Sequence, residues 1–460
     1  MDIGIIGAGI TGLTAAYDLT KGGHAVTVYE ARPYVGGLAA GFRDERWEWP
    51  LDRFYHHWFS SDGDVIGLIE ELGARDRLFF PWPTTTMYHQ GRLYPLDSPI
   101  PALKFIPVSQ LHRAIRVLQF APLPFVDRMR IGLVAFYLTL TRDWRPLERI
   151  SADAWLRRAV GQRAYEVWWK PLLISKFGEE NYRDVNMAWM WARLYKRSAR
   201  LGYFAGGFQG FADLLAGRVR EQGGEVRLET AVQAVRPAAD SGPAVDSGLA
   251  VDSGLADDGR LRLETAAGSF DHERVIATCS PQEMLRLAPG LSADYAAKLA
   301  GLRSMGAVVL ILALRRRLTD GHYWINLPKG GEFPFMGLVE HTNYISLEHY
   351  GGDHVVYCGD YLPPDHPYFD TSKERLLEAY LPGLAKINPE FRLDWVRASW
   401  MFAEKYAQPV PTLNHARNIP PLKTSIPGLW MANMSQVYPW DRGSNYAVEM
   451  GRRVAREVVS

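Results

Sequence analysis

The stretch GIIGAGITGLTAAYDLTKGGHAVTVYE, residues 4 to 30, decides the fold expected for this chain. Its apolar, β-branched start predicts a buried parallel strand, and the glycine-rich GAGITG at 7–12 then predicts a turn into a helix over 13–21. HAVTVYE predicts a second strand that ends on Glu30. Strand, glycine turn, helix and strand in this order are typical of a dinucleotide-binding unit.

Each glycine of the turn has a physical reason. Gly7 permits the tight turn, Gly9 lets backbone N–H groups approach a pyrophosphate, and Gly12 lets the helix pack closely on the strand. The partial positive charge of the helix N-terminus, where Ile10 and Thr11 lie, favours that anion. An ordinary tight strand–helix turn is the alternative interpretation.

The acid Glu30 and the segment after it narrow down the ligand. Glu30 is placed to accept hydrogen bonds from a ribose diol, and its charge disfavours a 2′-phosphate. The following ARPYVGGLAAGF resembles the E-x-R-x-x-x-G-G extension of the large FAD-dependent family of monoamine oxidases, protoporphyrinogen oxidases, phytoene desaturases and UDP-galactopyranose mutases. In that family the arginine and the glycine pair contact the pyrophosphate and the ribityl chain. The resemblance therefore implies FAD, with contacts from Ala31, Arg32, Gly36, Gly37 and Leu38.

The resemblance reappears in IPGLWMANMSQVYPWDRGSNYAVEMGRRVAREVV, residues 426 to 459. GLWMA predicts a strand, and the amphipathic segment after it predicts a helix capped by Ser444 or Asn445. The family points this helix N-terminus at the flavin, which implies that Tyr446 and Ala447 present N–H groups to the ring.

Two departures from the family lie just before this helix. The family's A-G-D or A-G-E is replaced by Ala432-Asn433-Met434, so Asn433 is the candidate cofactor contact and Met434 is a poor acceptor. The segment YPWDRGSN brings Trp440 toward the edge of the flavin, either as a substrate wall or as loop packing.

The catalytic candidates lie on two further segments. WPLDRFYHHWFSSD, 49–62, resembles the G-x-H-x-F strip that lines the flavin in relatives, which implies a proton-transfer or polarising role for His57. His56 is expected on the opposite side of the strand. ASWMFAEKYAQPVP, 398–411, resembles the strand before the flavin-closing segment and makes Tyr406 a second candidate beside Lys405. A structural role for each is the alternative.

The predicted fold class is α/β, α+β overall, with a Rossmann-like FAD domain intergrown with a helical and antiparallel-sheet substrate domain. The FAD domain comprises 1–95, 203–290 and 395–460, and the substrate or cap domain comprises 96–202 and 291–394. By resemblance, Val235 contacts the adenine. SADAWLRRAV predicts a cap helix starting at Ser151 or Asp153, near tryptophans that either fill a core or line a cavity. The repetitive, small and polar 240–259 is expected to be a flexible loop.

Bulk properties exclude several classes. With 52 basic and 51 acidic residues, no electrostatic footprint for nucleic acid is present. Two cysteines rule out a disulfide framework, and no metal-ligand spacing is found; EHYGGDH at 348–354 favours a polar turn over a metal clasp. A strand beginning at Ile3 leaves no room for a signal peptide. The apolar stretch 131–140 is shorter than the roughly 20 residues that span a bilayer.

The sequence therefore predicts a cytoplasmic FAD-dependent oxidoreductase that transfers a hydride from an apolar or aromatic small molecule to flavin N5. An isomerase resembling UDP-galactopyranose mutase and a non-enzymatic binding protein resembling GDP-dissociation inhibitors are the rivals. The basic, proline-punctuated segment 99–140 leaves peripheral membrane contact open, although packing inside the cap explains it as well. The oligomeric state is not predicted.

Overall fold

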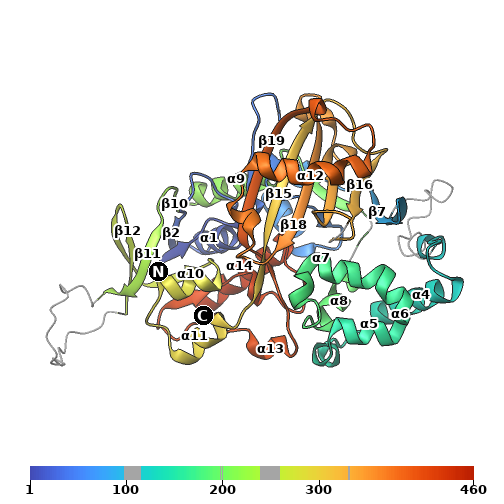
Figure 1. The fold of residues 1–460 in the computed structure, drawn as a ribbon. Coiled ribbons are helices and arrows are strands. Elements are labelled where there is room, and N and C mark those ends of the chain that lie inside the picture. The colour runs from blue at the N-terminus through green and yellow to red at the C-terminus, as the bar shows by residue number, and fades with distance from the viewer. Residues whose placement is uncertain (98–114, 197, 199, 239–258, 330–331) are drawn as a thin grey trace.

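The computed structural model describes residues 1–97, 115–196, 198, 200–238, 259–329 and 332–460. The expected flexible loop at 240–259 and the first part of the segment 99–140 lie outside these residues, apart from Gly259. Helices and sheets alternate along the chain and pack as one intergrown body (Figure 1). This arrangement agrees with the predicted mixed α/β class.

A parallel sheet carries the glycine turn. Its strand order is β10-β2-β1-β14-β20, so the first strand lies at the centre and the last strand of the chain at one edge. The strands are β1 Asp2–Ile6, β2 Ala25–Tyr29, β10 Glu225–Arg227, β14 Arg274–Ala277 and β20 Leu429–Met431. The buried, β-branched strands predicted at 3–6 and 25–29 are therefore confirmed.

Helices flank this sheet, and one helix pair is in close contact. A Cβ built on Gly451 of the last helix would lie 2.6 Å from the Thr11 carbonyl oxygen, so glycine brings that helix directly against the first one. The helices are α1 Ile10–Lys21, α2 Gly63–Glu71, α9 Gly207–Glu221, α10 Pro281–Leu287, α11 Ala293–Ala300 and α14 Ser444–Val459.

A second, largely antiparallel sheet forms the upper part of the molecule in Figure 1. Its order is β19-β15-β18-β17-β16-β7-β8, with one parallel pair between β16 and β7. The strands are β7 Thr84–His89, β8 Arg92–Asp97, β15 Ser304–Leu314, β16 His322–Asn326, β17 Gly337–Glu340, β18 His354–Leu362 and β19 Val396–Pro409, and α12 Lys373–Ile387 packs on this sheet.

The cap is a helical group with an aromatic core. Ser151 caps its second helix by accepting a hydrogen bond from Ala154 N–H, as predicted, and Asn186 caps the last one through Trp189 N–H. Trp189 and Trp191 are each only 2% exposed, so these tryptophans fill a core. The helices are α4 Phe125–Leu140, α5 Ala152–Val160, α6 Gln162–Ala164, a π-helical turn Tyr165–Trp169, α7 Lys170–Asn181 and α8 Met187–Tyr195.

Short elements connect the three parts. Strands β11, β12 and β13 form a small antiparallel sheet of their own. Two-residue strands at 58–59 and 78–79 pair with the strand 201–204. These strands are β3 Gly41–Phe42, β4 Leu51–Asp52, β5 Trp58–Phe59, β6 Leu78–Phe79, β9 Leu201–Phe204, β11 Val232–Pro237, β12 Leu261–Thr265 and β13 Gly268–His272, and the short helix α13 is His415–Asn418.

The sheets group the chain somewhat differently from the predicted domain boundaries. Residues 84–95 and 396–409, assigned to the FAD domain from the sequence, hydrogen-bond within the seven-stranded sheet. Strand β19 pairs with β15 in an antiparallel ladder, so 396–409 forms the edge of this sheet. The domain division itself stays a prediction.

Candidate active site

The glycine turn is shaped by close backbone contacts. Gly7 has a φ of 101°, which a side chain rarely adopts, and a Cβ on Gly12 would lie 2.0 Å from the Gly7 carbonyl oxygen. A Cβ on Gly9 would meet no atom closer than 3.9 Å, from Gly37. The first and third glycines are therefore required by the protein itself, whereas Gly9 leaves open space beside the backbone.

Glu30 closes the turn from the end of β2. One carboxylate oxygen accepts a hydrogen bond of 2.8 Å from Ala8 N–H, and the other accepts one of 2.9 Å from Arg32 N–H. A carboxylate has about four acceptor positions, so each oxygen can still accept from a ribose hydroxyl. Glu30 thus fixes the turn and keeps the acceptor capacity predicted for it.

The glycine pair Gly36-Gly37 lies directly on the turn. Gly36 N–H donates to the Ala8 carbonyl at 2.8 Å, and Gly36 and Gly37 have φ values of 111° and 58°. A Cβ on Gly37 would approach Gly9 Cα to 3.1 Å. The structure therefore packs the glycine pair directly against the glycine turn.

The side chains around the pair are spread between surface and core. Ala31 and Arg32 are exposed, Leu38 is half-buried, and the Arg32 guanidinium donates to Tyr34 at 3.1 Å and forms an ion pair of 3.8 Å with Glu404. Arg32 therefore links the extension to β19 in the described contacts.

Two helix N-termini at this site are free of side-chain caps within the described part of the chain. Gly9 is the N-cap of α1, and Gly443 is the N-cap of α14. The cap predicted at Ser444 or Asn445 is wrong, because Ser444 instead accepts from Trp58 Nε1 at 2.6 Å and Asn445 accepts from Val65 N–H. Both helices thus keep first-turn N–H groups for an anionic or carbonyl partner.

Of the two residues expected to present backbone N–H groups at the start of α14, one already uses its N–H group within the helix. Ala447 N–H donates to the Gly443 carbonyl at 3.0 Å and closes the first turn. Tyr446 precedes it and lies in the first turn itself. The helix terminus is therefore presented by Ser444 to Tyr446, and Ala447 lies one residue too far along.

The strip 53–59 joins the glycine turn to the N-terminus of α14. Arg53 N–H donates to the Ala40 carbonyl at 3.1 Å at one end, and Trp58 reaches Ser444 at the other. His57 lies 6.1 Å from the Trp324 ring, whereas His56 lies 5.2 Å from the Phe208 ring on α9. The two imidazoles do face opposite sides, as expected for an extended segment.

His56 is a half-buried imidazole on the side of the strip opposite His57. Burial, together with the nearby Arg442 charge, lowers the pKa of His56 to about 4, so its ring is neutral at pH 7. Beside it, burial raises the pKa of Tyr55 well above its ordinary value. Tyr55 and His56 therefore offer neutral hydrogen-bonding groups.

Asn433 and Tyr406 form a hydrogen-bonded group at the end of β20. Asn433 accepts from Ser435 N–H at 3.0 Å and donates to the Cys279 carbonyl at 3.0 Å, while the Tyr406 hydroxyl lies 2.7 Å from Ser435 Oγ. Burial raises the pKa of Tyr406 above its ordinary value. Lys405 beside it is exposed, with its ammonium 5.8 Å from the Phe369 ring centroid.

Trp440 belongs to an aromatic stack. Its ring is stacked on Tyr446 at 6.0 Å and on Trp191 of the cap at 5.5 Å. Together with Met434 and Trp189 it lines a small pocket between α8 and the segment before α14. Trp440 thus joins the cap to the N-terminus of α14, as a wall would.

Asp441 is held by contacts from α8, from β19 and from its own neighbour Arg442. Its carboxylate accepts from Trp189 Nε1 at 3.1 Å, from Gln408 at 3.3 Å, from Arg442 N–H at 3.1 Å and from Arg193. This network fixes the backbone just before Gly443, the residue that starts α14. The position of the helix N-terminus therefore depends on Asp441.

Cations surround the same carboxylate. Although burial alone would raise the pKa of Asp441, the charges of Lys176, Arg193 and Arg442 hold it well below its usual range. Arg442 also donates to the Tyr361 hydroxyl on β18. The sequence identified the crowding at 440–442 but not these partners, which come from distant segments.

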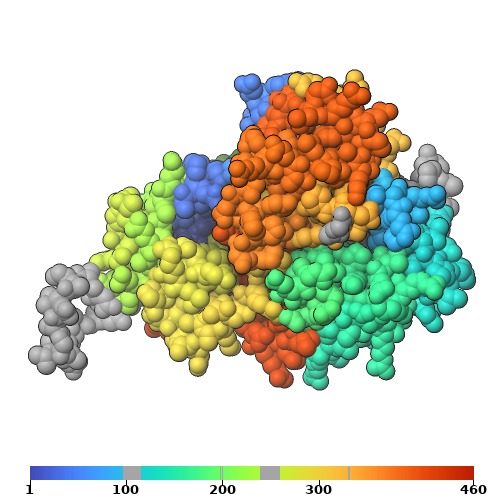
Figure 2. Space-filling model, viewed as in Figure 1, coloured from blue at the N-terminus to red at the C-terminus, as the bar shows by residue number. Residues whose placement is uncertain are grey.

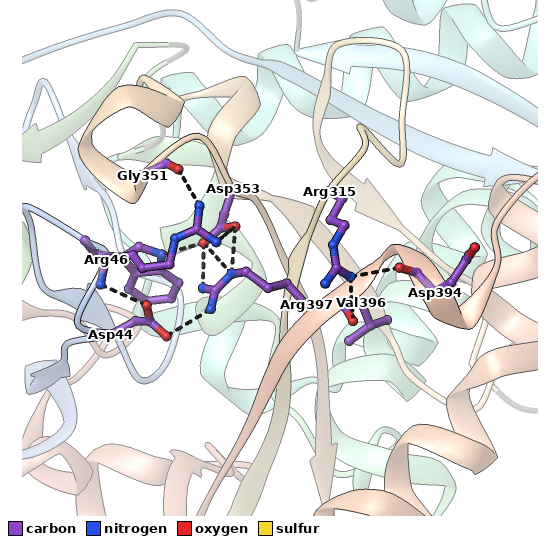
Figure 3. Close-up of polar contacts among 9 residues, drawn as sticks. Asp44, Arg46, Arg315, Gly351, Asp353, Asp394, Val396 and Arg397 are labelled. Carbon is purple, nitrogen blue, oxygen red and sulfur yellow. Dashed lines mark hydrogen bonds and ion pairs between the residues drawn. The ribbon is translucent and has the colours of Figure 1, made fainter.

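A second ionic cluster fixes the loop after the glycine pair. Figure 3 shows Arg397 of β19 between Asp353 and Asp44, with its Nη2 2.6 Å from Asp353 Oδ2 and its Nη1 3.3 Å from Asp44 Oδ2. Trp47 Nε1 donates to Asp353 at 2.9 Å. The cluster ties loop 44–47 to the seven-stranded sheet, so Asp353 serves as an ion-pair partner. Among the described residues no three metal-ligating side chains gather.

Val235, the residue predicted to contact the adenine, lies in the small antiparallel sheet. Val235 pairs with Leu263 inside the small antiparallel sheet and is buried. Thr230 N–H instead donates to the Glu30 carbonyl at 2.8 Å, and Val232 is buried two residues later, before a bulge. Val232 therefore lies closer in the sequence to Thr230, which contacts Glu30, than Val235 does.

These features fit a dinucleotide. The open space at Gly9, the acceptor Glu30 and the uncapped N-terminus of α1 lie at the glycine turn, and the strip 53–59 reaches the uncapped N-terminus of α14 through Trp58. Donors suited to a pyrophosphate at one end and to a ring carbonyl at the other match the two ends of a flavin dinucleotide.

The family model of the flavin containing amine oxidoreductases matches residues 10–459, and the chain belongs to that family. FAD as the cofactor and an oxidoreductase class follow from this membership. The resemblance found in the sequence is thereby confirmed.

Curated relatives match the chain over shorter stretches. Zeta-carotene desaturase of Synechocystis sp. is 30% identical over 181 residues, which are 37% of this chain and 36% of that protein. Mitochondrial protoporphyrinogen oxidase of Nicotiana tabacum is 37% identical over 86 residues, 19% of this chain and 17% of that one. The matched stretches thus span only 36% and 17% of the lengths of these two relatives.

The fold extends over the whole chain. Reduced UDP-galactopyranose mutase superposes with a TM-score of 0.70 and 16% identity, covering 100% of this chain and 95% of that one. The likeness confirms the predicted fold class. No helix of the described residues is long and apolar enough to cross a bilayer.

Proposed function

We propose that this chain oxidises an apolar or aromatic small molecule by accepting a hydride onto flavin N5. The observations that carry the proposal are the open space at Gly9 in the glycine turn and the uncapped N-terminus of α14, beside which Trp440 and Tyr446 are stacked. The redox chemistry is supplied by bound FAD, which takes up the two electrons and the hydrogen of a hydride.

The binding roles divide between the glycine turn and α14. We assign the pyrophosphate to the first turn of α1, to Arg32 and to the Gly36-Gly37 pair, the ribose to Glu30, and the adenine to the 230–235 segment. The first turn of α14 would stabilise negative charge at the ring end.

Among the catalytic candidates, His57 and His56 hold the position best suited to proton transfer. Their segment borders α14 on one side and the seven-stranded sheet on the other. His57 would hold or move a proton at substrate, and the neutral His56 would accept a hydrogen bond. Tyr406 is engaged with Ser435, so we give it a positioning role.

Trp440 would form the substrate wall. Its stack on Trp191 and Tyr446 presents a flat apolar surface beside α14, and the small pocket next to it is lined by Trp189, Tyr438 and Met434 as well as by the polar Gln408, Asp441 and Arg442. This surface and the relatives named as acting on carotenes and protoporphyrinogen support an apolar or aromatic substrate.

Anaerobic reduction of the purified protein tests the reaction type. Amines, porphyrinogens, carotenes and nucleotide-sugars are added in turn while the flavin absorbance is followed. We expect bleaching by one of the first three classes. Interconversion of a nucleotide-sugar without net reduction would instead support the isomerase that resembles UDP-galactopyranose mutase, and a protein that binds no FAD would support the non-enzymatic binding protein.

Rapid-mixing kinetics with that substrate test His57. His57→Ala should keep the flavin spectrum and reduce about 10²- to 10⁴-fold more slowly, the usual worth of acid–base assistance. Tyr446→Phe is the control, since it preserves the backbone role assigned to Tyr446. Reduction of His57→Ala at the wild-type rate would move the proton-transfer role to another residue.

A further inference from the structure

Four aromatic rings stand in series between the start of α14 and the surface of the cap. The Tyr446 ring is stacked on Trp440 with centroids 6.0 Å apart and 10° between the planes, and Trp440 is stacked on Trp191 at 5.5 Å and 27°. Tyr195, at the end of α8, lies 4.8 Å from the Trp191 ring and 6.4 Å from the Trp440 ring. These four residues form the aromatic chain.

The two ends of the aromatic chain lie in different surroundings. Tyr446 lies in the first turn of α14, where the proposed function places the ring end of FAD. Tyr195 at the other end is 39% exposed, whereas Trp191 between them is only 2% exposed. Figure 2 shows that the cap helices form part of the outer surface of the molecule. The aromatic chain therefore connects the proposed flavin site to solvent through a buried tryptophan.

The residue types in the aromatic chain suit the transfer of single electrons. Tryptophan and tyrosine rings give up one electron to a strong oxidant, whereas phenylalanine rings resist oxidation. An oxidised flavin that has absorbed blue light is such an oxidant. The chain's successive ring centroids are 4.8 to 6.0 Å apart, with 10° to 31° between their planes. Neighbouring π systems are thus close to contact, and an electron can pass from ring to ring.

Another tryptophan at the same helix terminus packs against phenylalanines instead. Trp58, which donates to Ser444 Oγ at 2.6 Å, is 1% exposed. Its ring lies 4.3 Å from Phe208 and 5.5 Å from Phe211, and both of these rings are fully buried. A positive hole, the site of a missing electron, that forms on Trp58 would therefore stay beside the flavin, whereas one on Trp440 can move outward.

Charge and solvent favour the outer end of the aromatic chain. The Lys196 ammonium lies 5.0 Å from the Trp440 ring centroid, and its charge opposes a positive hole on that ring. The carboxylate of Asp441, the next residue in the sequence, is already surrounded by three cations. The exposed Tyr195 phenol can release its proton to water when it loses an electron. A hole therefore moves toward Tyr195 and is trapped there as a neutral radical.

We propose that the aromatic chain carries single electrons from the protein surface to FAD excited by blue light, with a thiol as the electron donor. FAD takes one electron from the Tyr446–Trp440 pair, and electrons move inward until the hole resides on Tyr195. A thiol gives one electron to Tyr195, and the phenol regains a proton from water. Two such cycles join two thiols into a disulfide and place two electrons and two protons on the flavin. The proposal rests on the proposed function for the position of FAD, but not for the substrate.

Photoreduction of the full-length protein loaded with FAD tests the aromatic chain. The protein is illuminated with blue light in the absence of oxygen and with excess dithiothreitol, and samples kept in the dark give the thermal reduction by thiol. Flavin bleaching is recorded, together with the absorption of tryptophan and tyrosine radicals after a laser flash. Tyr195→Phe keeps the ring but removes the phenol that ends the chain. Tyr137→Phe is the matched control, since it makes the same change at an exposed cap tyrosine that stacks on Trp155.

We expect the wild type and Tyr137→Phe to show a long-lived tyrosyl radical and to bleach at the same rate in the light. Tyr195→Phe should lose most of this radical signal and bleach much more slowly, with its FAD content unchanged. Equal radical lifetimes and bleaching rates in Tyr195→Phe and the wild type would overturn the proposal and leave the stack as core packing. So would a yellow wild type that light does not bleach. A wild type that binds no FAD would contradict the proposed function and, with it, this proposal.

Discussion

The glycine turn is held by contacts between near neighbours in the sequence, whereas the segment before α14 is held by residues from all over the chain. Glu30 bonds to Ala8, 22 positions away, and to Arg32, two positions away. Asp441 bonds to Trp189 and Arg193 at separations of 252 and 248 residues. Contacts between residues close in the sequence thus determine the glycine turn. The N-terminus of α14, in contrast, is positioned only once the cap helices have packed against it.

The largest expected effect lies at the local end. Gly12→Ala places a methyl group 2.0 Å from the Gly7 carbonyl oxygen, so the turn or α1 must move. We expect a loss of more than about 3 kcal/mol, beyond the usual range for overpacking, together with loss of FAD. Urea unfolding of the two proteins measures this loss. A variant as stable as the wild type would show that the turn is not rigid.

At the long-range end, Asp441→Asn removes the counter-charge of Lys176, Arg193 and Arg442. Breaking a buried ion pair costs about 3–5 kcal/mol, which we expect at neutral pH. Because the folded pKa of Asp441 is depressed, its stabilisation is fully present above about pH 4 and is lost only below it. Urea midpoints between pH 5 and 8 should therefore differ by a constant amount. A difference under about 1 kcal/mol would contradict this account of the segment.

Asp52 of β4 should give a pH dependence of the opposite sign, which is spread over several pH units. Burial raises its pKa to about 7, although Phe208 N–H and the Tyr203 hydroxyl bond to it. Because its folded pKa lies above the unfolded value of about 3.9, stability falls as pH rises from about 4 to 7. Asp52→Asn should remove a slope of up to about 1.4 kcal/mol per pH unit. Thermal melts at pH 5, 6 and 7 measure this slope, and an unchanged slope in the variant would refute the assignment.

The smallest expected effect is that of Gly217→Ala, which is the matched control for Gly12→Ala. Gly217 lies inside α9, and a Cβ there meets no atom within 4 Å. Gly217→Ala should therefore stabilise the protein by about 0.5–1 kcal/mol and leave FAD content unchanged. The same urea titration applies, and destabilisation would mean that α9 tolerates less than its open surroundings indicate.

The parts of the fold that the sequence predicted are those fixed by local chemistry. Gly7, Gly12 and Glu30 determine their turn through backbone contacts, so spacing alone revealed the parallel unit. The cap at Ser444 was mispredicted because the choice depends on Trp58, which lies 386 residues away. Similarly, the bulge between Val232 and Ala234 breaks the alternation along β11, and no sequence pattern signals it.

The candidate site divides in the same way. The glycine pair and the strip around His57 could be identified by motif, whereas the partners of Asp441 and Arg442 could not. Arg442 meets Tyr361 only because β18 lies in a sheet formed from several segments of the chain. Long-range partners of this kind follow from packing and not from periodicity.

FAD content tests the central claim, that the Gly9 surface holds the dinucleotide. Wild type and Gly9→Val are purified, incubated with excess FAD, desalted and assayed by flavin absorbance per chain, with circular dichroism as the fold control. The account predicts about one FAD per wild-type chain, and a folded Gly9→Val that holds almost none, because a side chain there fits the protein but not a pyrophosphate. A colourless wild type, or a Gly9→Val that retains full FAD content, would contradict it.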